Sequence, residues 1–179
     1  IFSDYRGDFL PLSNYLRRKR ATFDAQAFAR LLDIWAELLA NVTPCKQDNK
    51  LAIPLVGGGQ VTVTPRGVCI EGEPTPAIMR ATMRHIAEEW GGRAVIPVGA
   101  EISREDRLKA HAYARVFGIE LDDRNEGFLP LAFTQAELDR LPAMCAEIRA
   151  QHPDVPPERP DAKRAQPEPR PFAVPRLAA

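Results

Sequence analysis

The sequence has no net charge, few aromatic residues and no long apolar run. Lys and Arg total 24 and so do Asp and Glu, while Phe, Trp and Tyr make up only 7% of the 179 residues. A general nucleic-acid binder carries a clear positive excess, so only a local basic patch remains for that role. No run approaches the roughly 18 apolar residues of a membrane-spanning helix, and the start, IFSDYRGDFL, lacks the charged and apolar regions of a signal peptide. We therefore expect no membrane contact.

Cysteine is scarce as well. Cys45, Cys69 and Cys145 are odd in number and include no CxxC pair, which argues against a disulfide framework and against a zinc site. Three cysteines without a disulfide pattern fit a protein of the reducing cytoplasm. The length and the hydrophobic content of 45% suit one folded domain with a tail, and the first residue, Ile1, is not Met, which indicates a piece of a larger protein.

Residues 1–50 are predicted to form an N-terminal helical segment. Apolar residues recur at spacings of three and four and predict a helix over about 24–41, with Trp35 on its core face. The preceding stretch, PLSNYLRRKR, predicts a shorter helix or turn ending in four consecutive cations, which suit either a solvated helix end or a basic contact surface. Residues 42–50 are expected to form a polar linker. The apolar face of the longer helix comprises Phe28, Leu31, Leu32, Trp35, Leu38 and Leu39.

From Leu51 onward the pattern changes from helical to alternating. Residues 51–55 and 61–64 alternate on either side of the turn GGGQ, so they predict a β-hairpin. Residues 68–70 predict a third short strand, which ends at the turn signals of Gly72 and Pro74. The three strands together predict an antiparallel meander.

Two helix–strand units follow this meander. Thr75 before Pro76 marks the start of the first helix, which is expected to end at Trp90, a core residue. Gly91 then takes a left-handed conformation and leads into a buried strand over 94–98. The Trp-Gly-Gly stretch is thus predicted to be a helix stop and a change of direction.

The second unit carries the same signals. Ser103 with Asp106 resembles a capping box, Gly118 closes the helix, and residues 119–121 predict another strand. Such alternation favours parallel strands with right-handed crossovers. We expect an α/β (α+β) fold in which a mixed sheet combines the antiparallel hairpin with a β-α-β-α-β run, with N-terminal and C-terminal helices packed on it.

The α/β domain is expected to span 51–150 and to end in a helix. Thr134 and Glu137 have the spacing of a capping box, and Pro142 predicts a bend. Residues 153–179 are rich in proline and charged residues. Such a segment cannot bury enough apolar area to offset the entropy of ordering, so a flexible tail or linker is predicted. The apolar side of the last helix comprises Leu138, Leu141, Cys145 and Ile148.

No stretch matches a catalytic or cofactor motif. The GGGQ turn lacks the Lys and Ser or Thr of a phosphate loop, and the Trp-Gly-Gly stretch ends a helix, where the dipole repels anions. Cys69, His85 and Asp122 or Asp123 form a nucleophile, base and orienter only if the fold brings them together, and each also suits an ordinary structural position. The histidines lack carboxylates at ligand spacing. We predict no catalytic, cofactor or metal site.

Basic residues recur near the faces of the predicted helices. Arg80 and Arg84 are four residues apart on one helix, and Arg104 and Arg107 lie on the next. Loose clusters of this kind suffice to position a domain on phosphates without reading bases, although glutamates and aspartates are interspersed among them. The candidate DNA or partner contacts are Arg17, Arg18, Lys19, Arg20, Arg80, Arg84, Arg104 and Arg107.

Four stretches occur in a recognisable order: VTVTPRGVCIEG, IMRATMRHIAEEWGG, AVIPVG and KAHAYARVFGIEL. In this order residues 51 to about 123 resemble the large polyvalent protein-associated domain, seventh of that series, which accompanies relaxases of conjugative and mobilisable plasmids. In that family the first helix commonly ends in a basic residue, an aromatic residue and Gly, followed by a strand, a Gly and a second helix that closes on a Gly-aliphatic pair. Glu89 stands here where a basic residue is more usual. The matching positions are Trp90, Gly91, Gly92, Gly99, Gly118 and Ile119.

The resemblance implies a non-catalytic accessory domain, without cofactor, of a cytoplasmic bacterial relaxase or mobilisation protein. Its implied role is DNA contact, protein docking or recognition by a secretion channel, and the implied partners are single-stranded or duplex DNA and relaxosome or type IV secretion proteins. The parent protein would be a DNA-nicking transesterase.

Two other function classes stay open. One is a protein-interaction domain of a mobile-element protein without nucleic-acid contact. Exposed apolar area would favour it, whereas a continuous basic face free of carboxylates would favour DNA contact. The other is an enzyme that uses Cys69 and His85, which requires the thiol and the imidazole to come within hydrogen-bond reach.

Overall fold

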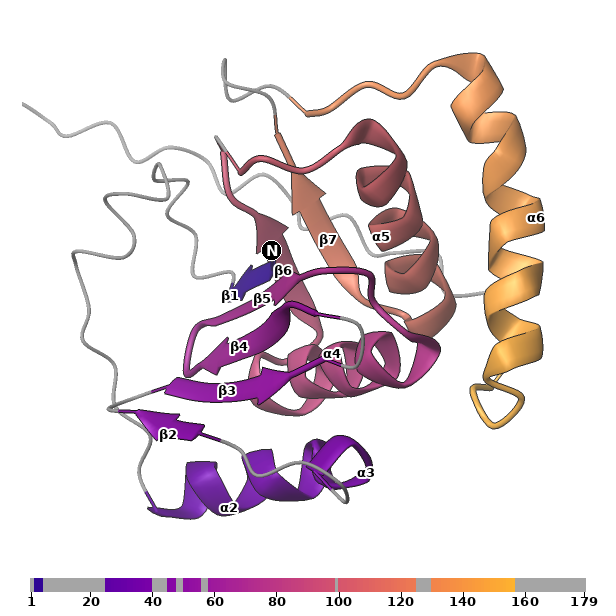
Figure 1. The fold of residues 1–179 in the computed structure, drawn as a ribbon. Coiled ribbons are helices and arrows are strands. Elements are labelled where there is room, and N and C mark those ends of the chain that lie inside the picture. Colours follow the sequence, from indigo (N-terminus) through magenta and orange to yellow (C-terminus); the bar gives the residue numbers. More distant parts are fainter. Residues whose placement is uncertain are drawn as a thin grey trace, which may run out of the picture.

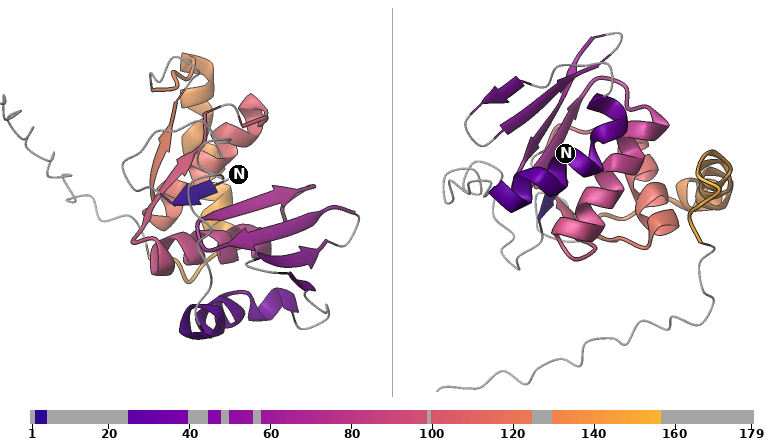
Figure 2. Two further views of the ribbon diagram at one scale, coloured as in Figure 1. Left: turned by 90° about the vertical axis from the view of Figure 1, so that its left-hand side faces the viewer. Right: turned by 90° about the horizontal axis from the view of Figure 1, so that it is seen from below.

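The computed structural model describes residues 2–4, 25–39, 45–47, 50–55, 58–98, 100–124 and 130–156, and these form one mixed sheet with helices against one of its faces (Figures 1 and 2). The strand order is β2-β3-β4-β5-β1-β6-β7. Helices α4 and α5 lie against the sheet, α2 and α3 pack beside α4, and α6 packs against α5. The predicted α+β class and mixed sheet are therefore confirmed. The strands are β1 (Phe2–Asp4), β2 (Cys45–Gln47), β3 (Lys50–Pro54), β4 (Gln60–Thr64), β5 (Gly67–Glu71), β6 (Arg93–Ile96) and β7 (Glu120–Asp123), and the helices are α2 (Ala25–Ile34), α3 (Ala36–Leu39), α4 (Pro76–Glu89), α5 (Arg104–Phe117) and α6 (Gln135–Gln151).

Strands β3, β4 and β5 form the predicted antiparallel meander. The hairpin turn depends on Gly59, whose φ is 91° and at which an added Cβ would lie 1.9 Å from the carbonyl oxygen of Glu71. Only glycine fits such a close backbone approach at positive φ. Alternate side chains along these strands point into the core, and the buried ones are Leu51, Ile53, Val61, Val63 and Val68.

Two strands were not foreseen from the sequence. Strand β2 lies within residues 42–50, which were predicted to be a linker, and pairs antiparallel with β3. Strand β1, from the segment predicted to be helical, lies between β5 and β6 and pairs antiparallel with both. Both strands are three residues long, too short to show a hydrophobic period, so tertiary pairing alone defines them.

The β-α-β-α-β run is present as β5-α4-β6-α5-β7. Strands β6 and β7 are parallel neighbours, whereas β5 and β6 run in the same direction with β1 between them. Both predicted helix starts are confirmed, because Thr75 Oγ1 accepts from the Ile78 amide at 3.3 Å and Ser103 Oγ accepts from the Asp106 amide at 3.0 Å. Gly118 closes α5 in the left-handed conformation, with φ 70°.

The limits of three elements differ from the prediction. The helix expected over 24–41 breaks at Trp35 into α2 and α3. The strand expected over 94–98 ends at Ile96, since Pro97 has no amide hydrogen to donate. The last strand runs to Asp123, two residues further than expected.

Helix α6 begins with the predicted capping box of Thr134 and Glu137 and continues through Pro142. Two of the residues predicted for its apolar side, Cys145 and Ile148, are buried, but Leu138 is 42% exposed. The prediction was wrong for Leu138 because the first turns of α6 are held on α5 by charged side chains, described below, on either side of Leu138.

The first residues of the predicted tail are folded onto the domain. Val155 packs partly against the core, its amide donates to the His152 carbonyl at 3.1 Å, and Asp154 forms an ion pair with Arg80 of α4. Residues 153–156, the first residues of the predicted tail, therefore contact the domain. Residues 157–179 lie outside the described residues.

His152, at the end of α6, is a buried titratable group. It is 2% exposed and lies against the rings of Tyr113 and Phe117, with centroid distances of 6.1 and 5.3 Å. Within the part of the chain that the structure describes, neither ring nitrogen has a hydrogen-bond partner. Burial, and then the nearby Arg80 guanidinium, lowers the pKa of His152 from its ordinary 6.5, although Asp154 opposes this. The folded protein therefore favours the neutral imidazole.

Acidification is expected to weaken the domain through His152. Because its folded pKa lies below its unfolded pKa, its contribution to stability is complete above about pH 6.5 and is lost as the pH falls through the folded pKa. Urea unfolding at about pH 7.5 and about pH 5 measures this loss. A His152→Phe variant should lose stability less steeply than the parent protein. An unchanged slope would contradict the role of His152.

Candidate functional site

The structure describes four of the eight residues predicted to contact DNA or a partner. Arg80 and Arg84 lie on α4, and Arg104 and Arg107 lie on α5. The other four, Arg17, Arg18, Lys19 and Arg20, lie outside the described residues. The four described arginines are therefore judged by what their guanidinium groups contact.

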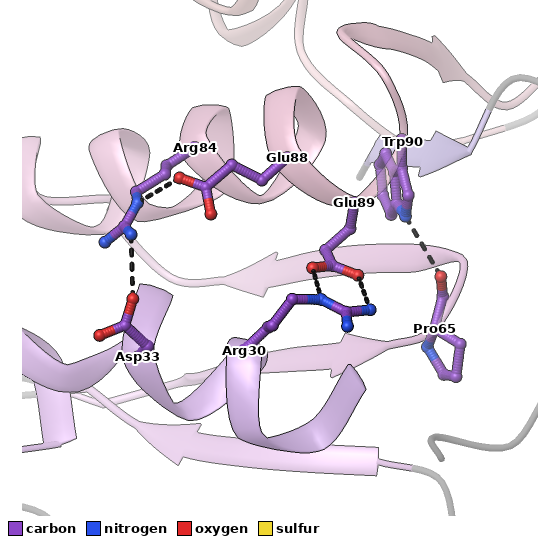
Figure 3. Close-up of polar contacts among 7 residues, drawn as sticks. All are labelled: Arg30, Asp33, Pro65, Arg84, Glu88, Glu89 and Trp90. Carbon is purple, nitrogen blue, oxygen red and sulfur yellow. Dashed lines mark hydrogen bonds and ion pairs between the residues drawn. The ribbon is translucent and has the colours of Figure 1, made fainter. Parts of the chain in front are cut away.

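On α4 the side chain of Arg84 faces carboxylates of α2 and of α4 itself (Figure 3). Arg84 donates from Nε to Glu88 Oε1 at 2.6 Å and from Nη2 to Asp33 Oδ2 at 3.0 Å. In the opposite direction, Arg30 of α2 donates to both carboxylate oxygens of Glu89, at 2.6 and 3.1 Å. These pairs join α2 to α4 and occupy the guanidinium of Arg84. Arg80, one turn nearer the start of α4, is held by Asp154.

On α5 the two candidate arginines, Arg104 and Arg107, hold neighbouring segments in place. Arg104 donates to both carboxylate oxygens of Glu137, at 2.7 and 2.6 Å, and to the Ala132 carbonyl at 3.0 Å. The bonds from Arg104, and then those from Thr134, lower the pKa of Glu137 to about 2. One turn further along, Arg140 of α6 pairs with Glu105, with oxygen contacts of 2.9 and 2.6 Å. Charged contacts thus fix the first half of α6 on α5.

Arg107 points inward and not to solvent. Its side chain is 13% exposed and forms an ion pair with Asp123 at the end of β7, whose side chain is 1% exposed. Arg107 also donates to the Ala100 carbonyl at 3.2 Å, and His111 Nε2 lies 3.3 Å from the other oxygen of Asp123. Arg107 therefore neutralises a buried carboxylate and is a structural residue.

Taken together, the four candidate arginines that the structure describes all face carboxylates. A continuous basic face free of Glu and Asp, the feature expected of a DNA-contacting surface, does not occur on these parts of α4 and α5. Exposed apolar area is equally sparse, because Leu138 is the one large apolar side chain found exposed among the described residues. On the part of the chain that the structure describes, neither an extended basic face nor an extended exposed apolar face is present.

The Trp-Gly-Gly stretch has a structural role (Figure 3). Trp90 is 8% exposed, its Nε1 donates to the Pro65 carbonyl at 3.2 Å, and its ring meets that of His85 edge to face at 5.1 Å. Gly91 and Gly92 have φ values of 69° and 78° and turn the chain, and the Gly92 carbonyl accepts from the Glu120 amide at 2.8 Å. The stretch ends α4 and aligns β6 with β7, as its helix-stop prediction required. Trp90, and Trp35 at 0% exposure, lie in the core as predicted.

The proposed nucleophile and base are separated. His85 is 1% exposed on α4, which lies against the core face of the sheet, whereas strand alternation points Cys69 away from the face that carries Val68. Burial raises the pKa of the Cys69 thiol, which disfavours the reactive thiolate. Asp122 pairs with Arg124 at 3.1 Å and Asp123 with Arg107 and His111. The arrangement of Cys69 with His85 is therefore not a catalytic one.

A cavity of about 470 Å³, which the sequence gave no reason to predict, lies at the carboxyl ends of β5 and β6. It falls within the size range of small-ligand pockets. Residues from three strands, two helices and two loops line it, and they come from β1, from the β5–α4 stretch and from the β6–α5 stretch, which no single sequence motif contains. The one trace of this cavity in the sequence is the acidic stretch after Gly99, with Glu101 and Asp106. This stretch does not reveal which residues of β1, β5 and α4 line the cavity with it. The lining comprises Phe2, Cys69, Ile70, Glu71, Gly72, Pro74, Met79, Ile96, Glu101, Ile102, Asp106, Lys109 and Ala110.

None of the helices that the structure describes has the length and apolar character needed to cross a membrane. No protein-family model, curated protein or solved structure matches this chain.

Proposed function

We propose that this chain is a non-catalytic docking domain of a bacterial, cytoplasmic relaxase or mobilisation protein, and that it binds a protein of the relaxosome or secretion machinery. Support for the parent system comes from the resemblance of residues 51 to about 123. The order of hairpin, helix, strand and helix in that resemblance agrees with the order of β3, β4, β5, α4, β6 and α5.

The observation that favours docking over DNA contact is the pairing of the arginines. Arg80, Arg84 and Arg104 are 40% to 49% exposed, so a phosphate can reach them, but each already faces a carboxylate. Binding to DNA gains most of its free energy from cations that neutralise phosphates and release counterions. An arginine that stays paired with its carboxylate does not neutralise a phosphate. An arginine that pairs with a phosphate instead leaves its former carboxylate partner, with its negative charge, beside the DNA. Arg107 would also leave Asp123 buried without its cation.

DNA contact stays as the second proposal because of one sequence feature. Arg17, Arg18, Lys19 and Arg20 form the densest basic run of the chain, without an intervening acid. Four cations in sequence suit sequence-independent phosphate contact. The docking proposal therefore predicts no DNA binding, whereas the second proposal assigns DNA binding to residues 17–20.

Fluorescence anisotropy with labelled single-stranded and duplex DNA, across a salt series, separates these proposals. The docking domain is expected to show no saturable binding at physiological salt, and an Arg80→Ala plus Arg84→Ala variant should behave like the parent. Binding that weakens with salt and with this double variant would overturn the docking proposal. Binding that is lost only on replacing residues 17–20 by alanine would establish the second proposal in its place.

A further inference from the structure

Helix α6 is a peripheral element of the described fold. It lies on the side of α5 that faces away from the sheet, and α5 is its main neighbour (Figures 1 and 2). Two ion pairs with half-exposed arginines hold its first turns, and exposed ion pairs contribute little to stability. Its buried side chains are Cys145 and Ile148, followed by His152 at its end. A peripheral element with so few buried contacts can open at a lower free energy than the sheet.

Residues 152–156 follow α6 and return to the domain as a short segment, here called the strap. His152 is buried against two aromatic rings of α5, and Val155 packs partly against the core. Asp154 reaches α4, where it forms an ion pair with Arg80. The strap therefore ties the end of α6 to two helices through one buried ring, one half-buried side chain and one ion pair.

The imidazole of His152 is buried without compensation for its polarity. Neither ring nitrogen has a hydrogen-bond partner within the described residues, so the closed strap takes this ring out of water without replacing its hydrogen bonds. The neutral ring can occupy such a place beside aromatic rings. A protonated ring would be a buried cation without an acceptor, which costs far more free energy.

The groups around His152 do not stabilise its cation. The Arg80 guanidinium of α4 repels it, and the Asp154 carboxylate attracts it but is already paired with Arg80. Burial raises the pKa of Tyr113 on α5, so its phenol stays uncharged. Arg149 is the other charged residue within four positions of His152 along the chain, and it is a cation as well. Water is therefore the better environment for protonated His152.

We propose that acid releases the strap: protonation of His152 frees residues 152–156 and the last turns of α6 from α4 and α5 while the sheet stays folded. The proton is taken up by one ring nitrogen, and the imidazolium moves into water. Release separates Asp154 from Arg80 and uncovers the rings of Tyr113 and Phe117. The domain then gains a cation without its carboxylate beside an apolar surface, whatever partner it binds.

Hydrogen exchange followed by NMR on the full 179-residue chain tests the release. One reporting amide is that of Val155, which donates to the His152 carbonyl, and the other is that of His152, which donates to the end of α6. After correction for intrinsic exchange, both are expected to exchange about threefold to tenfold faster at about pH 5.5 than at about pH 7.5. An opening that exposes a histidine of ordinary pKa is favoured by up to about tenfold over this range.

Low urea concentrations separate release of the strap from unfolding of the domain. A local opening exposes little surface, so urea below the unfolding range should hardly change exchange of the Val155 amide. The amides of Val61 and Val63 in β4 exchange through unfolding of the sheet. Their exchange should be slower and should increase strongly with urea.

Three variants identify the titrating group. His152→Phe keeps an aromatic ring against α5 but cannot be protonated, so Val155 should exchange equally at both pH values. Asp154→Asn changes an exposed side chain and removes the pair with Arg80, so Val155 exchange should be faster at both pH values while its pH response remains. The matched control, His111→Gln, removes a histidine that contacts Asp123 of β7 and should keep the full response.

The proposal is overturned by Val155 exchange that does not change with pH, or by a pH response that survives in His152→Phe. It is also overturned if the amides of His152 and Val155 exchange at the rate and with the urea dependence of Val61 and Val63. In that case acid would act on the whole domain and not on the strap.

Discussion

Replacing Trp90 by alanine is expected to lower the free energy of unfolding by about 3 to 5 kcal/mol. The indole fills the space between the end of α4 and the β4–β5 turn, where it is 8% exposed and bonded to the Pro65 carbonyl (Figure 3). Its removal leaves a cavity beside His85 and also leaves the Pro65 carbonyl without this donor. Urea unfolding followed by circular dichroism measures the change.

A Trp90→Phe variant separates packing from hydrogen bonding. Phenylalanine keeps an aromatic ring against His85 but has no N–H group, so it should cost clearly less than alanine. A loss below about 1 kcal/mol for Trp90→Ala would contradict the core role of Trp90. The aromatic residue that the resembling family has at this position would then indicate a functional role and not a packing role. Gly91→Ala gives an independent check, since a residue other than glycine at φ 69° costs about 1 to 2 kcal/mol.

Replacing Arg107 by methionine is expected to destabilise the domain by about 3 kcal/mol, because it leaves the Asp123 carboxylate buried without its cation. Methionine keeps most of the side-chain volume, so the loss reports charge more than packing. Asp123→Asn should cost less, since Arg107 is the more exposed partner and keeps its bond to the Ala100 carbonyl. Urea unfolding of both single variants at neutral pH tests this order.

The double variant completes the comparison. With Met at position 107 and Asn at position 123 there is no unpaired buried charge, so its stability should exceed the value expected from adding the two single losses. Additive losses would mean that Arg107 and Asp123 act independently. A small loss for Arg107→Met with a large loss of DNA binding would instead return Arg107 to the DNA-contact residues.

Local sequence rules predicted the helix ends and the hairpin well. Thr75, Ser103 and Thr134 cap helices, and Gly118 ends one, because each of these roles is decided by atoms within four residues along the chain. The alternation from Leu51 to Val63 likewise defines which side chains face the core. The same rules failed for Leu138, because its helical spacing is correct but the neighbouring helix contacts that turn through ion pairs.

The candidate site was predicted less well than the fold. The sequence identified Arg80, Arg84, Arg104 and Arg107 as basic residues on helices, which is where they lie. It did not identify Asp154 as the partner of Arg80, 74 positions away, or Asp123 as the partner of Arg107. Charge patterning along one helix cannot reveal partners that are distant in sequence. For this reason the sequence predicted that these arginines could bind phosphate, whereas in the fold carboxylates already neutralise them.

The sequence by itself determined the α+β class, the meander, the two helix–strand units and the absence of a catalytic motif, since these depend on periodicity, capping and residue spacing. Only the tertiary structure decided that β1 enters the sheet between β5 and β6, that the arginines are paired, and that a cavity lies at the carboxyl ends of β5 and β6. The physical reason is that these features join segments far apart in the chain. Their formation depends on long-range packing that compensates the entropy of closing large loops, and no local pattern encodes it.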